Sequence, residues 1–242
     1  MRERSLKRIE TFLASRLAPG STLLLGFSGG VDSLALLDML RLIAPRYTYA
    51  LHLAHVDHGW RPESAEEARL LEASHPEPFH LHTLRDHQGR NLEEAGREAR
   101  LAFFASVYRE VGASALLLAH HRDDHAETVL KHIFEGASPL GIRDDRSLRG
   151  MRILRPLLTT PKKELRALCL EKGLSPIEDP TNRDKRFLRG RMREAIVPQL
   201  EEAFGKSIAR NLSHLARHTA EVEAYIERRI APYLTTQSIP CD

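Results

Sequence analysis

Short apolar runs alternate with amphipathic segments along most of this 242-residue sequence, and this alternation constrains the fold more than any other feature. Continuous apolar runs are typical of strands covered on both faces, as in a parallel sheet. Apolar residues three and four positions apart are typical of amphipathic helices. The predicted strands are residues 22–27, 49–55, 79–84, 115–119 and 152–158, and the predicted helices that follow them are residues 34–43, 63–73, 92–111, 123–134 and 162–172. The sequence therefore predicts an α/β fold, a parallel five-stranded sheet with helices on both faces and right-handed crossovers.

Two further helices are predicted outside this alternating region. Residues 6–17 precede the first strand, and residues 208–230 follow the point, near Pro198, at which the strand pattern ends. We therefore expect an α/β domain over residues 1–200 and a small C-terminal helical segment over residues 201–242.

The composition is that of an ordinary globular protein. Hydrophobic residues make up 42% of the sequence and charged residues 29%, and 36 Lys+Arg against 33 Asp+Glu give a formal charge of +3. This composition excludes disordered and fibrous proteins. No apolar run approaches the ~20 residues that a membrane-spanning helix needs, and the charged first ten residues differ from a secretory signal. Cys169 and Cys241 are too few for a disulfide framework, which favours a reducing compartment. We expect a cytoplasmic protein without a membrane partner.

The turn after the first predicted strand carries the most specific motif. It reads Ser28, Gly29, Gly30, Val31, Asp32 and Ser33. In a parallel sheet this position brings backbone N–H groups and a helix N-terminus to an anion, and adjacent glycines allow close approach of the main chain. An acid at a phosphate site makes sense if Mg²⁺ lies between Asp32 and the phosphates. The alternative is a turn in which Asp32 or Ser33 is the helix N-cap.

The S-G-G-V-D-S motif resembles the pyrophosphate loop of the N-type ATP pyrophosphatases, which have an adenine nucleotide alpha hydrolase-like fold. The dinucleotide and P-loop fingerprints are absent. The resemblance implies that residues 1–200 form an ATP pyrophosphatase domain that cleaves ATP between its α- and β-phosphates. It implies that residues 28–33 bind ATP and that Asp32 is catalytic and binds Mg²⁺.

A second motif follows the second predicted strand. The sequence from His55 to Ser64 resembles the H-V-D-H-G-L-R-x-E-S stretch of tRNA(Ile)-lysidine synthetases, with Trp60 in place of leucine. The resemblance places His55 and Val56 beside the adenine, which main-chain groups largely hold. A solvated helix start is the alternative for Arg61 and Glu63.

The segment from Ala119 to Thr128 resembles A-H-H-x-D-D-Q-x-E-T of the same family, with His125 in the glutamine position. Asp124 and Glu127 are three residues apart, so they share a helix face. Two carboxylates can bind a substrate ammonium, and the resemblance assigns them to free L-lysine and to catalysis. The alternative is an acidic capping box, in which each side chain binds a backbone N–H.

Two arginines match the family pattern N-L-E-x-x-x-R-x-x-R, namely Arg97 and Arg100. The resemblance directs Arg100 toward the catalytic pocket. On residue type alone, an arginine on an amphipathic helix is usually at the surface.

A strongly basic stretch indicates an RNA-binding segment. Residues 183–193 contain one acid and six basic residues, Arg183, Lys185, Arg186, Arg189, Arg191 and Arg193. Such a cluster suits a phosphodiester backbone, and the alternative is an exposed basic helix without a partner. The stretch resembles the family's D-P-T-N…R-N-x-x-R, with Gly190 in the asparagine position, and Arg152 to Leu158 resembles its I-x-R-P-L-L element.

Together the motifs cover about residues 20–200 in the family's order. The resemblance implies ATP-dependent ligation of lysine to C2 of the wobble cytidine, C34, of tRNA(Ile) with a CAU anticodon. The implied intermediate is an adenylated cytidine, and the by-products are AMP and pyrophosphate. Longer members carry further C-terminal domains, so the sequence is either a short form or a fragment.

Three other functions stay open at this point. Another pyrophosphate-loop enzyme, such as a tRNA thiolase, would use cysteine pairs, whereas Cys169 stands alone on a predicted helix. A metal-dependent hydrolase would need an H-x-H-x-D-H pattern, which residues 53–58 and 120–125 each miss by one residue. A pure RNA-binding module would leave the glycine turn unexplained. The sequence gives no indication of the oligomeric state.

Overall fold

The structure is a computed structural model that describes residues 2–57, 59, 63–84, 92–177 and 188–234. Its contacts divide the chain into two compact units. The first unit comprises Met1–His121 and Asp144–Pro180, and the second comprises Arg122–Arg143 and Thr181–Asp242. The predicted boundary between a catalytic domain, residues 1–200, and a helical segment, residues 201–242, stays a prediction.

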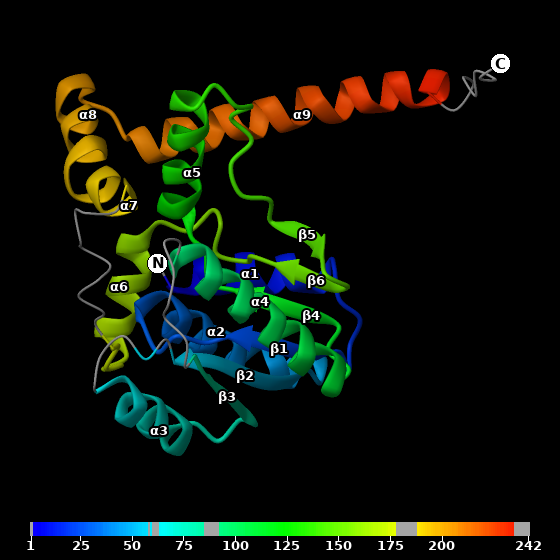
Figure 1. Cartoon of the computed structure of the whole chain (residues 1–242), viewed down its shortest axis with the longest axis vertical. Coiled ribbons are helices and arrows are strands. Elements are labelled where there is room, and N and C mark those ends of the chain that lie inside the picture. Colours follow the sequence, from blue (N-terminus) through cyan, green and yellow to red (C-terminus); the bar gives the residue numbers. More distant parts are fainter. Residues whose placement is uncertain (1, 58, 60–62, 85–91, 178–187, 235–242) are drawn as a thin grey trace. The chain divides into compact units, whose positions relative to one another are not determined.

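The first unit is an α/β domain, as the sequence predicted (Figure 1). Its described strands are β1 (Thr22–Gly26), β2 (Ala50–Asp57), β3 (Phe79–Thr83), β4 (Ala115–Leu118), β5 (Asp145–Leu148) and β6 (Met151–Leu154). Its described helices are α1 (Arg2–Ala14), α2 (Val31–Tyr47), α3 (Ser64–Ser74), α4 (Leu92–Glu110) and α6 (Lys162–Glu171). The six strands form one sheet in the order β3-β2-β1-β4-β6-β5. All neighbours are parallel except β5 and β6.

Strand β5 is a correction to the predicted five-stranded sheet, because no strand was predicted between the helix ending at residue 134 and the strand beginning at residue 152. It pairs antiparallel with β6, from Asp145 opposite Leu154 to Leu148 opposite Met151. Its sequence, DRSL, lacks apolar alternation, which an edge strand with one neighbour does not require. Arg149 and Gly150 have φ values of 52° and 76°, as the two central residues of a type I′ hairpin turn require. Arginine is uncommon there, so the turn signal was weak.

The sheet has an apolar core on each face, which follows from the alternation of side chains along a strand. Leu23 and Leu25 of β1 lie in a cluster with residues of α1, α2 and α6. Leu24, between them, lies in a second cluster with Phe104 and Val107 of α4. Because both faces of β1 are buried, its sequence reads as one continuous apolar run.

The register brings the carboxyl ends of three strands to one edge of the sheet. Gly26 of β1 lies opposite Ala54 of β2 and Leu118 of β4. Loops that follow these strands therefore leave from the same edge, which is where parallel α/β sheets bind ligands.

The second unit is helical in its described parts (Figure 1). It contains α5 (Arg122–Phe134), α7 (Leu188–Arg191), the π-helix η2 (Met192–Ile196), α8 (Val197–Phe204) and α9 (Ile208–Leu234). Helix α9 packs against α5, and Ser138 Oγ donates a hydrogen bond of 2.7 Å to Glu223 Oε1. The predicted helix over residues 208–230 corresponds to α9. None of the helices that the structure describes combines the length and the apolar character needed to cross a membrane.

Candidate functional site

The glycine turn joins β1 to α2 in a conformation that requires glycine. Gly29 has a φ of +74°, and a Cβ atom there would lie 2.8 Å from a side-chain carbon of Leu71. Its carbonyl accepts a hydrogen bond of 3.0 Å from the Ile177 N–H. Positive φ and close packing together disfavour any larger residue at this position.

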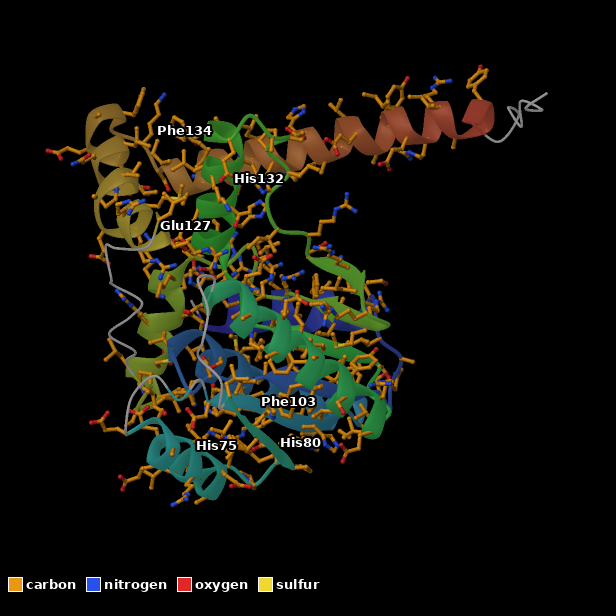
Figure 2. All side chains as sticks on the ribbon, viewed as in Figure 1. His75, His80, Phe103, Glu127, His132 and Phe134 are labelled. Carbon is orange, nitrogen blue, oxygen red and sulfur yellow. The ribbon has the colours of Figure 1, made fainter. Side chains whose placement is uncertain are left out.

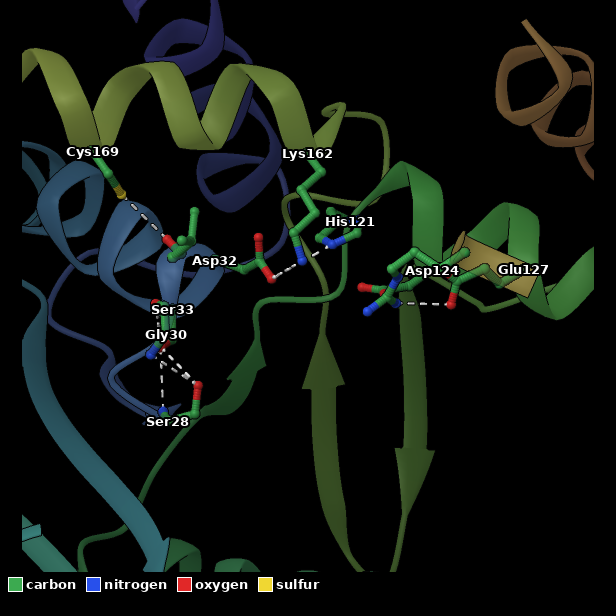
Figure 3. A network of polar contacts seen from close by, with 11 residues as sticks. Ser28, Gly30, Asp32, Ser33, His121, Asp124, Glu127, Lys162 and Cys169 are labelled. Carbon is green, nitrogen blue, oxygen red and sulfur yellow. Dashed lines mark hydrogen bonds and ion pairs between the residues drawn. The ribbon is translucent and has the colours of Figure 1, made fainter. Parts of the chain in front are cut away.

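Two serines hold the turn closed on itself (Figure 3). The Ser33 hydroxyl donates to the Gly30 carbonyl at 3.1 Å and lies 3.1 Å from the Ser28 hydroxyl. The N–H groups of Ser28 and Gly30 donate to Ser33 Oγ and Ser28 Oγ, each at 3.3 Å. Both predicted ATP-binding serines therefore shape the main chain of the turn.

The N-cap alternative for Asp32 and Ser33 is wrong. The N-cap of α2 is Gly30, and no side chain caps it, while Val31 and Asp32 are the first two residues of the helix. The first N–H groups of a helix have no partner within the helix and carry its positive dipole end. The turn therefore offers an anion the N-terminus of α2, with no side chain capping it.

Asp32 has one carboxylate oxygen bound and one unbound. Its Oδ2 lies 3.5 Å from Lys162 Nζ and 3.5 Å from His121 Nε2, whereas its buried Oδ1 has no hydrogen-bond partner. Burial raises the pKa of Asp32, but the hydrogen bonds and charges of His121 and Lys162 outweigh it, so the pKa lies below its ordinary value. Asp32 is therefore a carboxylate at neutral pH.

The unbound oxygen of Asp32 fits a Mg²⁺ ligand. Mg²⁺ is usually held by one or two carboxylates together with substrate phosphates and water, and Oδ1 is a buried oxygen that lacks a donor. The fit supports the prediction of a metal at Asp32, which stays a prediction.

Lys162 and His121 were not assigned roles from the sequence, although both contact Asp32. Lys162 is the first residue of α6, the helix that follows β6, and its position after a parallel strand was a usable signal. His121 is 1% exposed and lies inside the A-H-H motif. What the sequence lacked was a reason to pair either residue with Asp32.

His55 and Val56 lie on β2 and point to opposite faces, since they are consecutive in a strand. The His55 ring lies with Nδ1 2.8 Å from the Phe27 carbonyl, directly before the glycine turn. Burial lowers the pKa of His55, although this hydrogen bond opposes the effect. Val56 packs with the α4 cluster. Because the two side chains lie on opposite faces of the sheet, a single adenine ring cannot contact both of them. An adenine bound here would therefore be held by main-chain groups.

Arg97 and Arg100 are exposed on α4, which agrees with either interpretation of them. Arg155 of the R-P-L-L element has its pKa lowered to about 10, first by burial and then by the charges of Arg146 and Arg97. Its Nε donates to His120 Nδ1 at 3.2 Å. Asp144 opposes this lowering of the Arg155 pKa.

The histidines of β2 and β3 contact one another and aromatic rings. His52 Nδ1 lies 3.1 Å from His80 Nε2, and the His82 ring stacks on Phe103 of α4 at 5.1 Å. Figure 2 labels His80 and Phe103. Within the described residues, no group of three or more His, Cys, Asp or Glu side chains could hold a metal ion. The described part of the chain therefore gives no support to a metal-dependent hydrolase; His58 lies outside it.

In the second unit, Arg193 joins the two predicted lysine-binding carboxylates. Its Nε and Nη2 donate to Glu127 Oε1 and Oε2 at 2.8 and 2.9 Å, and Nη2 also lies 3.3 Å from Asp124 Oδ1. Glu127 is 4% exposed. Burial raises its pKa, and Arg193 opposes that rise.

This geometry contradicts the capping-box alternative. Helix α5 begins at Arg122, so Asp124 lies within its first turn, and both Glu127 oxygens accept from Arg193. His125, where the family has glutamine, is buried, and its Nδ1 accepts from the Ile142 N–H at 3.0 Å.

Three residues of the predicted RNA-binding stretch, Arg183, Lys185 and Arg186, lie outside the described residues. Arg189 and Arg191 are exposed on α7, whereas Gly190 between them is buried. Arg193 differs from these two arginines, because its guanidinium lies against Glu127.

The sequence is similar to that of several known proteins. Residues 1–200 match the PP-loop domain family. The chain is 40% identical over 237 residues to a tRNA(Ile)-lysidine synthase of Chlamydia pneumoniae, covering 95% of this chain and 73% of that protein. It is 36% identical over 236 residues to the tRNA(Ile)-lysidine synthase of Protochlamydia amoebophila, covering 95% and 52%.

The fold is also similar to that of a solved structure, the U34-tRNA thiolase NcsA from Methanococcus maripaludis with its [4Fe-4S] cluster. The TM-score is 0.68 at 20% sequence identity, and the match covers 89% of this chain and 78% of that one. At this identity the likeness concerns the fold alone.

Proposed function

The chain belongs to the tRNA(Ile)-lysidine synthase family, a ligase family with a PP-loop ATP-binding domain, and we propose that it joins L-lysine to C2 of C34 in tRNA(Ile) with a CAU anticodon. ATP supplies the activation. The observation that carries this proposal, beside family membership, is the Asp32 carboxylate in the glycine turn, whose Oδ2 contacts Lys162 and His121 and whose buried Oδ1 has no hydrogen-bond partner.

The reaction needs activation because the C2 oxygen of cytosine is a poor leaving group. In the first step this oxygen attacks the α-phosphorus of ATP, and the bond to the β-phosphate breaks, which releases pyrophosphate. In the second step the ε-amine of lysine attacks C2, the C2–O bond breaks, AMP leaves with that oxygen, and the amine loses a proton to solvent or base.

The first unit supplies the groups for the first step. The N–H groups at the start of α2 bind the phosphates, and His55 fixes the carbonyl of Phe27 before the turn. Asp32 would hold Mg²⁺, which would neutralise phosphate charge and stabilise the departing pyrophosphate. Lys162 and His121 keep the Asp32 carboxylate ionised and in place.

The second unit supplies the lysine and RNA contacts. Asp124 and Glu127 are two carboxylates one helical turn apart, which suit an ammonium group. Arg189 and Arg191 are exposed cations on one helix, which suit RNA phosphates. Arg100 is proposed to contact a phosphate or the developing anion, and Arg183, Lys185 and Arg186 to bind RNA.

A thiolase function is not supported by the cysteine that the structure describes. Cys169 is 3% exposed, and burial, followed by the charges of Asp32 and Asp38, raises the pKa of its thiol. Its Sγ donates to the Val31 carbonyl at 3.5 Å. Sulfur transfer and cluster ligation both need an accessible thiolate.

The test is transfer of radiolabelled lysine to unmodified tRNA(Ile) in the presence of ATP and Mg²⁺. We expect label in RNA, release of AMP and pyrophosphate, and no label when C34 is replaced by U. Asp32→Asn should lower the rate by at least about 100-fold without changing the circular dichroism spectrum. Tight RNA binding without ATP-dependent label transfer would reject the proposal.

A further inference from the structure

Arg193 contacts both of the predicted lysine-binding carboxylates in the second unit. Its guanidinium binds both oxygens of Glu127, and it also reaches Asp124. A bidentate arginine–carboxylate ion pair of this kind is stronger and more directional than a single charged hydrogen bond. It neutralises a carboxylate whose burial would otherwise be costly.

The same contact covers the carboxylates of Glu127 and Asp124, which are proposed to bind the ammonium group of lysine. The Glu127 side chain is 5% exposed and that of Asp124 is 15% exposed with Arg193 in place. A lysine ammonium that binds Glu127 must therefore replace the guanidinium. Because each cation carries one positive charge and donates to the same oxygens, the two compete for one position.

Arg193 also belongs to the basic stretch predicted to bind RNA. It follows Arg189 and Arg191, which are exposed, and it lies in the π-helix η2 between α7 and α8. Segments of π-helix are rare and are frequently found at functional sites. If η2 rewinds to α-helix, the residues before it rotate about the helix axis by about 100° relative to the residues after it. Such a rotation would move the Arg193 guanidinium away from Glu127.

Resting on the proposed function, we propose that Arg193 occupies the lysine-binding carboxylates until RNA draws it away. Lysine alone then binds weakly, because it must displace Arg193. An RNA phosphate that binds Arg193 leaves Asp124 and Glu127 open to the ammonium. By linkage, RNA strengthens lysine binding by the same factor by which lysine strengthens RNA binding.

The experiment measures L-lysine affinity by calorimetry with and without unmodified tRNA(Ile), in the absence of ATP so that no turnover occurs. For the unsubstituted protein we expect tRNA to tighten lysine binding about tenfold, within the usual range of coupling between sites. Arg193→Ala should bind lysine about tenfold more tightly without tRNA, and tRNA should then add little. Arg210→Ala, an exposed arginine of α9, is the matched control and should behave as the unsubstituted protein does.

Arg193→Lys serves as the second variant, because Arg193→Ala leaves Glu127 without its cation and could unfold. It keeps one positive charge but loses the paired contact, so it should also bind lysine more tightly than the unsubstituted protein. If folded Arg193→Lys binds lysine no more tightly than the unsubstituted protein, the inference is overturned. The proposed function still stands in that case, provided that the unsubstituted protein transfers label to RNA. If no variant binds lysine and no label is transferred, the proposed function itself fails, and the inference fails with it.

Discussion

The Nζ atom of Lys162 lies 3.5 Å from Oδ2 of Asp32, across 130 positions of sequence. The contact joins the first turn of α6 to the first turn of α2. It places a cation beside the carboxylate that we propose as a metal ligand. Two oppositely charged groups at the edge of a parallel sheet are suited to a ligand that carries both phosphates and a metal.

Lys162→Ala should weaken the use of ATP. Without this ammonium, Asp32 loses one of the two groups that lower its pKa, and bound phosphates lose a nearby cation. We expect kcat/KM for ATP to fall about 10- to 100-fold, measured by pyrophosphate release. Lys163→Ala removes the exposed neighbouring lysine on the same helix and should leave it unchanged; equal losses in both variants would refute a specific role for Lys162.

Gly29→Ala should destabilise the protein more than a matched glycine substitution does. Both Gly29 and Gly112 have positive φ, at +74° and +61°, but a Cβ meets Leu71 at 2.8 Å in the first case and nothing within 4 Å in the second. Gly112→Ala should cost about 1–2 kcal/mol from the left-handed backbone alone, and Gly29→Ala should cost about 1–3 kcal/mol more from overpacking. Urea denaturation measures the free energy of unfolding of both variants. Similar losses in the two would contradict the prediction, because they would show that the turn accommodates a Cβ atom at residue 29 at little cost.

Stability should fall as the pH drops below about 6.5, the ordinary pKa of histidine. Burial lowers the pKa of His125, although its bond to Ile142 opposes this, so the folded state binds fewer protons than the unfolded state. The stabilisation is complete above the unfolded pKa and is lost as the pH falls through the folded pKa.

His52 and His55 shift in the same direction, so replacing His125 removes only part of the effect. We expect His125→Gln to lose less stability than the unsubstituted protein between pH 7.5 and pH 5.5, measured by urea denaturation. Parallel losses would mean that His125 does not contribute to the pH dependence.

Glu127→Ala should raise the KM for lysine about 10- to 100-fold and leave the KM for ATP nearly unchanged. The variant removes the carboxylate that we propose binds the ammonium, while the glycine turn is untouched. Steady-state kinetics with each substrate varied in turn measure the difference. Glu202→Ala on α8, which is exposed, is the control. Equal rises in both KM values would contradict a lysine-specific role.

The sequence predicted the parallel strands well because their signal is local. Strands β1 and β4 are short apolar runs that are mostly buried, so few other structures fit their sequences. Strand β5 was missed because an exposed edge strand needs no apolar pattern, and its pairing depends on a turn at Arg149. Local patterns therefore predict core strands better than edge strands.

The glycine turn was also predictable, since its residue types, spacing and position after a strand all agree. The partners of the site residues were not. Lys162 contacts Asp32, and Arg193 contacts Glu127, across 130 and 66 positions. Nothing local to a lysine or an arginine indicates which distant carboxylate it will neutralise, so these pairs had to come from the tertiary structure.

The most direct test of the central claim is a crystal structure of the protein with ATP and Mg²⁺. We expect the β- and γ-phosphates against the N–H groups of residues 29–33 and a Mg²⁺ ion bound to the Asp32 carboxylate. A triphosphate bound elsewhere on the protein, with Asp32 still held only by Lys162 and His121, would contradict the account.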